Sequence, residues 1–107
     1  MKVRILTSAC RDLVAGQRFY GRQGADVAEY FSDSVFADID SLALYGGIHQ
    51  KVFGFHRLLA KRFPHAIYYR VEDGITVVVY RILDCRQDPA KTSRALRSAG
   101  TGDSPEY

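Results

Sequence analysis

Apolar positions in the first half of the chain recur at the spacing of an α-helix. The clearest stretch runs from residue 26 to residue 45, where five apolar side chains follow a period close to 3.6 and so form one buried face. These side chains are Ala28, Phe31, Val35, Ile39 and Leu42. Asp26 and Glu29 stand near the start, where negative charge favours the helix dipole. Gly46 and Gly47 predict its end, because glycine accepts the left-handed cap conformation.

A shorter apolar stripe predicts another helix ahead of this one. The stripe consists of Cys10, Leu13 and Val14. Thr7 or Ser8 is the expected N-cap, and the helix is expected to run to about Arg22. Val3 to Leu6 predicts a short strand before it. Because a short glycine-containing loop separates the two helices, we expect them to form a helical hairpin.

After Gly47 the pattern changes from helical to extended. We expect one strand within Phe55 to Phe63, one over Ala66 to Val71 and one over Ile75 to Leu83. Asp73-Gly74 is a signal for a type I′ turn between the last two strands. Asp88-Pro89 opens a short C-terminal helix that reaches about Leu96.

These elements predict an α+β fold with the order β-α-α-β-β-β and, optionally, the C-terminal helix. The helical hairpin would cover one face of an antiparallel β-sheet. We expect one domain over residues 1–97, followed by a tail over 98–107 that is rich in Gly, Ser and Pro and lacks ordered structure.

The predicted turn also suggests which side chains share a face of the sheet. If Asp73-Gly74 is a two-residue loop, Glu72 pairs with Ile75, and cross-strand partners point to the same face. One face then carries Ile67, Tyr69, Val71, Thr76, Val78, Tyr80 and Ile82. The other carries Ala66, Tyr68, Arg70, Val77, Val79, Arg81 and Leu83. The uncharged set is expected under the helices, because an unpaired arginine is costly to bury. A one-residue slip would exchange the assignment for one strand.

The open face would therefore carry cations and an exposed aromatic side chain. Such a surface suits contact with phosphate or with an acidic protein segment. The candidate partner- or phosphate-binding residues are Arg57, Lys61, Arg62, Tyr68, Arg70, Arg81 and Arg86. The alternative is that Arg70 and Arg81 only pair with Glu72 or Asp84 at the sheet edges.

Composition and charge fit this interpretation. The chain has 107 residues, of which 47% are hydrophobic, so disorder throughout is excluded. The net charge is +3, but residues 1–50 carry −1, residues 51–97 carry +6, and the last ten carry −2. The basic second half indicates a nucleic acid or an acidic protein as partner, or else a solvated basic surface.

Other classes of protein are disfavoured. Cys10 and Cys85 lie far apart and form no CxxC motif, so we expect two small buried residues without a disulfide. The histidines at 49, 56 and 65 lack zinc-ligand spacing, and we expect neither a metal site nor a cofactor. No stretch approaches the roughly 20 apolar residues of a membrane span, and the first residues lack a signal-peptide pattern. A cytoplasmic location is the expectation.

Two segments resemble toxins of the RelE/ParE family of type II toxin–antitoxin systems, which includes plasmid stabilisation proteins. Residues 62–71, RFPHAIYYRV, are similar to the central strands of these toxins. Residues 83–89, LDCRQDP, look like their closing Arg-x-Asp-Pro segment, and with the element order the likeness extends from Val3 to about Leu96. The resemblance implies neutralisation by a cognate antitoxin whose C-terminal segment wraps the toxin. It leaves open a homodimer or a toxin–antitoxin hetero-oligomer.

Members of this family act in two ways. RelE-like toxins cleave messenger RNA in the ribosome, which requires proton donors and acceptors beside cations that bind phosphate. If the chain is such a ribonuclease, its candidate catalytic residues are Arg57, His65, Arg81 and Arg86. However, Leu59 lies where a second cation is expected, and no aromatic residue follows Arg86 until Tyr107.

The ribonuclease set is therefore mostly missing, which favours the ParE-like branch. ParE-like toxins poison DNA gyrase by binding it. A ribosome-dependent messenger-RNA endonuclease with a variant site remains the alternative. A degenerate, non-toxic member that keeps only its affinity for the antitoxin is the third hypothesis.

Overall fold

The computed structural model describes residues 1–99, which form five strands and three helices. In chain order these are β1 (Lys2–Ile5), α1 (Thr7–Gly21), α2 (Ala25–Tyr45), β2 (Lys51–Val52), β3 (Phe55–Leu59), β4 (His65–Glu72), β5 (Thr76–Asp84) and α3 (Pro89–Ser98). The predicted α+β class, the helical hairpin and the C-terminal helix are confirmed. The two-residue strand β2 was not predicted, because it is too short to show an alternating pattern.

The last helix ends one residue before the end of the described chain. α3 includes Ser98, one residue beyond the domain boundary expected at 97 and within the predicted tail. Residues 100–107 of that tail lie outside the described residues.

The strands form one sheet in the order β1-β5-β4-β3-β2. β3, β4 and β5 are antiparallel neighbours, as predicted. β1 pairs with β5 in the parallel sense, from Lys2 opposite Thr76 to Ile5 opposite Val79, so the sheet is mixed rather than wholly antiparallel. The direction of β1 relative to a partner 74 residues away follows from the path of the chain through the hairpin, which local periodicity does not record.

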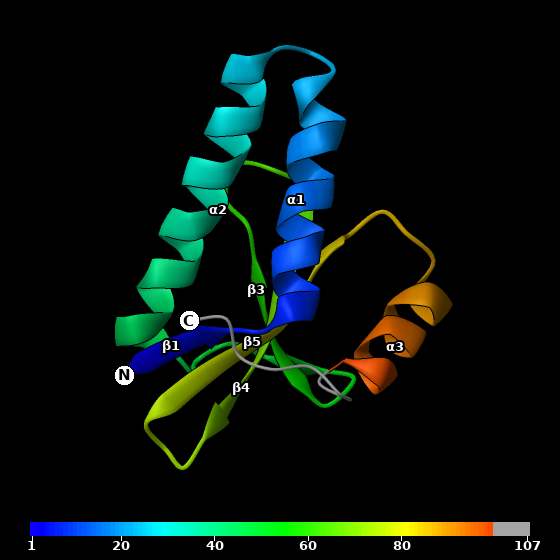
Figure 1. The fold of residues 1–107 in the computed structure, drawn as a ribbon. Helices are drawn as coiled ribbons and strands as arrows, with labels where there is room; N and C mark the ends of the chain where they lie inside the picture. The colour runs from blue at the N-terminus through cyan, green and yellow to red at the C-terminus, as the bar shows by residue number, and fades with distance from the viewer. Residues whose placement is uncertain (100–107) are drawn as a thin grey trace.

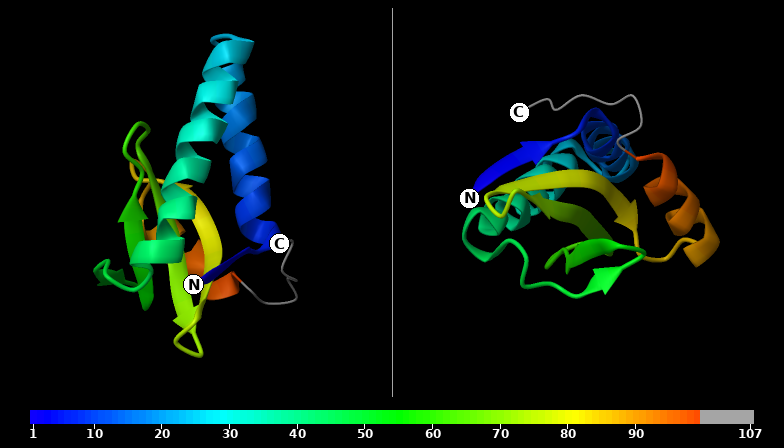
Figure 2. Two further views of the ribbon diagram at one scale, coloured as in Figure 1. Left: turned by 90° about the vertical axis from the view of Figure 1, so that its left-hand side faces the viewer. Right: turned by 90° about the horizontal axis from the view of Figure 1, so that it is seen from below.

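The helices α1 and α2 lie side by side over one face of the sheet, and α3 lies apart from them beside β5 (Figures 1 and 2). Four of the five side chains predicted for the buried face of α2 are in the core: Phe31, Val35, Ile39 and Leu42. The fifth, Ala28, is half-buried. From the sheet, this core contains Ile67, Tyr69, Val77, Val79 and Ile82.

The register of β4 and β5 differs from the prediction by one residue. Asp73 and Gly74 have the positive φ values of 57° and 70° that a type I′ turn requires, but the ladder pairs Glu72 with Thr76. A bulge then shifts the ladder, so that Tyr69 lies opposite Val79 while Tyr68 lies opposite Arg81. The predicted faces are therefore correct for β4 but wrong for β5 between the turn and the bulge.

The slip exchanges five side chains between the two faces, those of residues 76–80. Val77 and Val79 lie under the helices, where Val78 and Tyr80 had been expected. Tyr80 instead packs against Phe55 on the opposite face, which we call the outer face. Beyond the bulge, Ile82 is under the helices and Leu83 is on the outer face, as predicted.

α1 is tied to β5 at this bulge. Its N-cap is Leu6 rather than the expected Thr7 or Ser8. Ser8 Oγ donates to the Tyr80 carbonyl at 2.6 Å, and Asp12 Oδ2 accepts the Ile82 amide at 2.9 Å. Because Ser8 and Asp12 are one turn apart, they satisfy backbone groups on both sides of Arg81.

None of the helices described over residues 1–99 combines the length and the apolar character needed to cross a membrane.

Candidate functional site

The structure distributes the seven predicted binding residues over three places. Arg57, Tyr68 and Arg70 belong to the outer face of the sheet. Arg81 and Arg86 are held in ion pairs, that of Arg81 joining β5 to α1. Lys61 and Arg62 line a groove against α2. The sequence analysis expected these residues on the open face of the sheet, but Lys61 and Arg62 lie in the loop between β3 and β4, and Arg81 and Arg86 are in ion pairs.

Tyr68 is not the exposed aromatic side chain that the sequence suggested. It is 5% exposed and packs with Phe55, Leu83 and, from α3, Leu96 in a second small core on the outer face. Burial raises the pKa of its hydroxyl, and the neighbouring Arg57 opposes that shift. Tyr68 is therefore a packing residue of the outer face, opposite Arg57 in the ladder of β3 and β4.

Arg70 does lie on the outer face, in contact with aromatic rings. Its guanidinium carbon is 4.0 Å from the Phe55 ring centroid and 5.4 Å from that of Tyr80. Glu72 accepts the Tyr80 hydroxyl at 2.8 Å and forms no ion pair with Arg70 among the described residues. The alternative that Arg70 merely pairs at the sheet edge therefore does not hold.

The turn between β2 and β3 presents a residue that the sequence analysis missed. Phe53 has φ 55°, Gly54 has φ 82°, and the Phe53 side chain is 48% exposed. Phe53 lines two hollows on the outer face. One, of about 290 Å³, is also lined by Arg70 and Arg97, and the other, of about 90 Å³, by Arg57. Two aromatic residues around a glycine, FGF at 53–55, were the available signal.

α3 carries three cations that were also missed, of which Arg97 lines the larger hollow. Lys91, Arg94 and Arg97 are exposed, and residues 89–98 contain no acidic side chain. Asp88 instead caps the helix by accepting the Ala90 amide at 2.9 Å.

Arg81 was expected on the open face, and the structure corrects this placement. Its Nε donates to Asp12 Oδ2 at 2.7 Å and its Nη2 to Asp12 Oδ1 at 2.9 Å. The side chains of Arg81 and Asp12 are only 23% and 13% exposed, so this two-bonded pair is partly shielded from water. Arg81 is therefore occupied in joining α1 to β5.

Arg86 is likewise engaged, in a more exposed pair. It donates from Nη2 and Nε to Asp84 at 2.7 and 3.0 Å. The Arg86 guanidinium holds the pKa of the Asp84 carboxyl well below its ordinary value, at about 2.

His65 is buried rather than presented as an acid or base. It begins β4, and its ring packs against both long helices, with its centroid 5.2 Å from that of Phe31 and 6.0 Å from that of Tyr20. Its Nδ1 has no hydrogen-bond partner in residues 1–99, and burial lowers its pKa. None of the hollows described is lined by Arg57, His65, Arg81 and Arg86 together.

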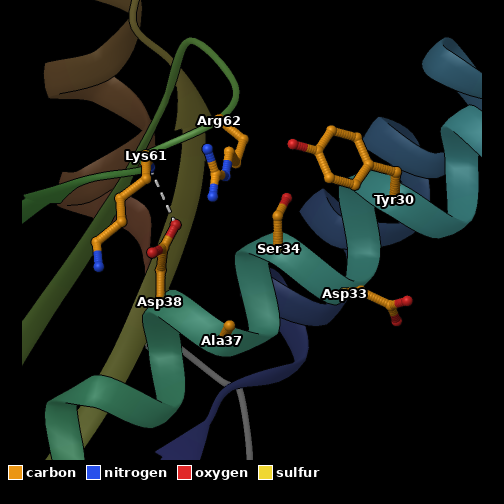
Figure 3. A pocket seen from close by; sticks show the side chains of 7 residues that line it. All are labelled: Tyr30, Asp33, Ser34, Ala37, Asp38, Lys61 and Arg62. Atoms are coloured by element: carbon orange, nitrogen blue, oxygen red, sulfur yellow. Dashed lines mark hydrogen bonds between the residues drawn. The ribbon is translucent and has the colours of Figure 1, made fainter.

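A groove runs between α2 and the loop that joins β3 to β4 (Figure 3). Asp38, only 5% exposed, accepts the backbone amide of Lys61 at 3.1 Å and so fixes the loop against the helix. Tyr30, 52% exposed, directs its hydroxyl toward Arg62 across the groove (Figure 3). The side of the groove on α2 thus carries Asp33, Ala37 and Asp38 besides Tyr30, and its loop side carries Lys61 and Arg62, so charges of both signs border it.

Both cysteines are free thiols, but their burial differs from the expectation. Cys10 is half-buried and Cys85 is exposed. Within the part of the chain that the structure describes, no three His, Cys, Asp or Glu side chains come close enough to hold a metal ion.

Comparison with known proteins places the chain in a family. The family model described as the ParE toxin of the type II toxin–antitoxin system parDE matches residues 3–89. No curated protein matches. A solved structure described as the chromosomal ParDE TA system from P. aeruginosa has a similar fold, with a TM-score of 0.67 and 22% identity over 77% of this chain and 92% of that chain. The chain therefore belongs to the ParE toxin family of type II toxin–antitoxin systems.

Proposed function

We propose that this protein is the toxin of a cytoplasmic toxin–antitoxin pair, that it inhibits DNA gyrase by binding it, and that a cognate antitoxin neutralises it. The match of the ParE family over residues 3–89 carries this proposal. The toxin would act by binding rather than by catalysis. A toxin that acts by binding needs a surface complementary to its target, and it needs no acid–base groups.

The geometry of the candidate catalytic residues supports the binding mode. Arg81 and Arg86 are occupied by Asp12 and Asp84. His65 is buried, and burial disfavours its charged form. A messenger-RNA endonuclease needs cations free to bind phosphate and a titrating group beside them. Of the four candidates, Arg57 forms no ion pair among residues 1–99, but the other three do not supply the rest of that set.

The antitoxin would occupy the groove along α2. An amphipathic helix would lie there with its acidic side chains toward Lys61 and Arg62 on the loop and its uncharged or basic side chains toward Asp33 on α2. Antitoxin binding would then leave a hetero-oligomer as the resting form.

Gyrase assays test the proposal directly. Purified protein added to gyrase and relaxed plasmid is expected to reduce supercoiling in a dose-dependent way, and pre-incubation with the antitoxin is expected to restore it. Normal supercoiling at saturating protein would contradict the gyrase target. A transcript cut in the A site of programmed ribosomes would instead favour the RelE-like alternative. Unimpaired growth on expression without the antitoxin would favour a non-toxic member.

A further inference from the structure

The residue Phe53 is held in a backbone conformation that a large side chain disfavours. Positive φ at both central positions of a type I′ turn normally selects Asn, Asp or Gly, yet Phe53 stands at the first of them with φ 55°. Its ring gains little burial in return, since the side chain is 48% exposed. A strained residue that folding does not need is a sign of a functional role.

The surroundings of Phe53 carry positive charge on both of its sides. Arg57 lines the smaller hollow, whereas Arg70 and Arg97 line the larger one. No residue that lines either hollow is acidic. Within residues 1–99, the cations of α3 form no ion pair with a carboxylate. The family match ends at Pro89, so these α3 cations lie beyond the segment it covers.

We propose that the outer face around Phe53 binds single-stranded DNA. A base would stack on the exposed face of the Phe53 ring, and phosphates on either side of it would contact Arg57 and the pair Arg70 and Arg97. Stacking on an aromatic side chain between cations is the usual way in which proteins hold a single strand without reading its sequence. Arg70 is already oriented by its contact with Phe55, so little freedom is lost when it binds phosphate.

An acidic peptide fits this site less well. Peptides that add to a sheet need a run of unpaired backbone groups, but the edge strand beside Phe53, β2, is only two residues long (Lys51–Val52) and offers few of them. A peptide helix would need the part of the face that α3 occupies. The choice of DNA over RNA rests on the proposed function, since gyrase acts on DNA.

Fluorescence anisotropy of labelled dT15 with the full chain, in the absence of gyrase, tests the inference. If three arginines each neutralise one phosphate, the logarithm of the binding constant is expected to fall with the logarithm of salt concentration with a slope of about −2. Arg97→Gln is expected to make that slope shallower by about 0.7. A 15-base-pair duplex is expected to bind more weakly, because its bases are not free to stack.

Variants of Phe53 separate binding from folding. Phe53→Asn is expected to raise the melting temperature, because Asn accepts a positive φ, and to weaken dT15 binding about tenfold. Phe53→Tyr keeps the ring and is expected to keep the affinity. The matched control is Phe19→Gln on α1, where the aromatic side chain is also 48% exposed, and it is expected to leave dT15 binding unchanged.

Four results would overturn the inference: absence of dT15 binding, equal binding of the duplex, tighter binding of rU15 than of dT15, or unaltered affinity in Phe53→Asn. Displacement of dT15 by an equal concentration of an oligoglutamate peptide would instead identify the face as a peptide site. Because gyrase is absent from this assay, the two proposals fail separately. A protein that binds dT15 but does not inhibit gyrase would contradict the proposed function and leave the DNA site intact.

Discussion

At the level of single residues, Asp12 has the most demanding role in the structure. Its carboxylate accepts two bonds from Arg81 and one from the Ile82 amide, 70 residues along the chain. Asp12→Ala would leave the partly shielded Arg81 guanidinium without its carboxylate and the Ile82 amide without an acceptor. We expect the free energy of unfolding to fall by about 3 kcal/mol, measured by urea denaturation.

The ion pair of Asp84 with Arg86 provides the control. The Arg86 side chain is 61% exposed, so water screens the interaction, and Asp84→Ala is expected to cost less than about 1 kcal/mol. Similar losses in the two variants would contradict the claim that Asp12 holds α1 on β5.

At the level of elements, the contact between α1 and α2 depends on Gly16. A Cβ added there would overlap Phe31 Cζ, and the Phe31 ring is fully buried against Tyr20 and Phe63. Gly16→Ala gains up to about 1 kcal/mol of helix propensity, but overpacking costs about 1–3 kcal/mol. We therefore expect a net loss of about 1 kcal/mol by denaturant unfolding.

Two further variants check this cause. At Gly21, in the same helix, an added Cβ would meet Ala28 Cβ at an ordinary 3.6 Å, so Gly21→Ala is expected to be neutral or stabilising. Combining Gly16→Ala with Phe31→Leu is expected to cost less than the sum of the two single changes, because the smaller side chain makes room. Additive costs would show that the clash is not the cause.

Sequence periodicity could predict the helical hairpin because its signal is local and repeated. Phe31, Val35, Ile39 and Leu42 share one face whatever they pack against. The sheet faces could not be predicted in the same way. One extra residue in the loop, Ile75, moves every β5 side chain between the turn and the bulge to the opposite face. The bond of Asp12 to Arg81 and the φ of Phe53 depend on neighbours and backbone geometry that no pattern of residue types records.

At the scale of the whole molecule, acid is expected to destabilise the fold through two histidines, the buried His65 and the half-buried His49. Burial lowers the pKa of His65, with Asp84 opposing it, and burial and then His56 lower the pKa of His49. His49 also holds the hydroxyl of the buried Tyr69, 2.5 Å from its Nδ1. In the unfolded chain both rings have the ordinary pKa near 6.5. Just below that pH the unfolded chain therefore binds more protons than the folded protein does.

The stability that this difference supplies is present above pH 6.5 and is lost as the pH falls through the lowered values in the folded state. The denaturant midpoint is therefore expected to be lower at pH 5.5 than at pH 7.5. His65→Gln and His49→Gln remove one titrating ring each and are expected to flatten the dependence, the double variant most of all. A midpoint that drops as steeply in the double variant as in the natural chain would mean that other groups carry the acid sensitivity. The carboxyl of Asp84, with its pKa of about 2, contributes only at much lower pH, because its ion pair survives until that carboxyl is protonated.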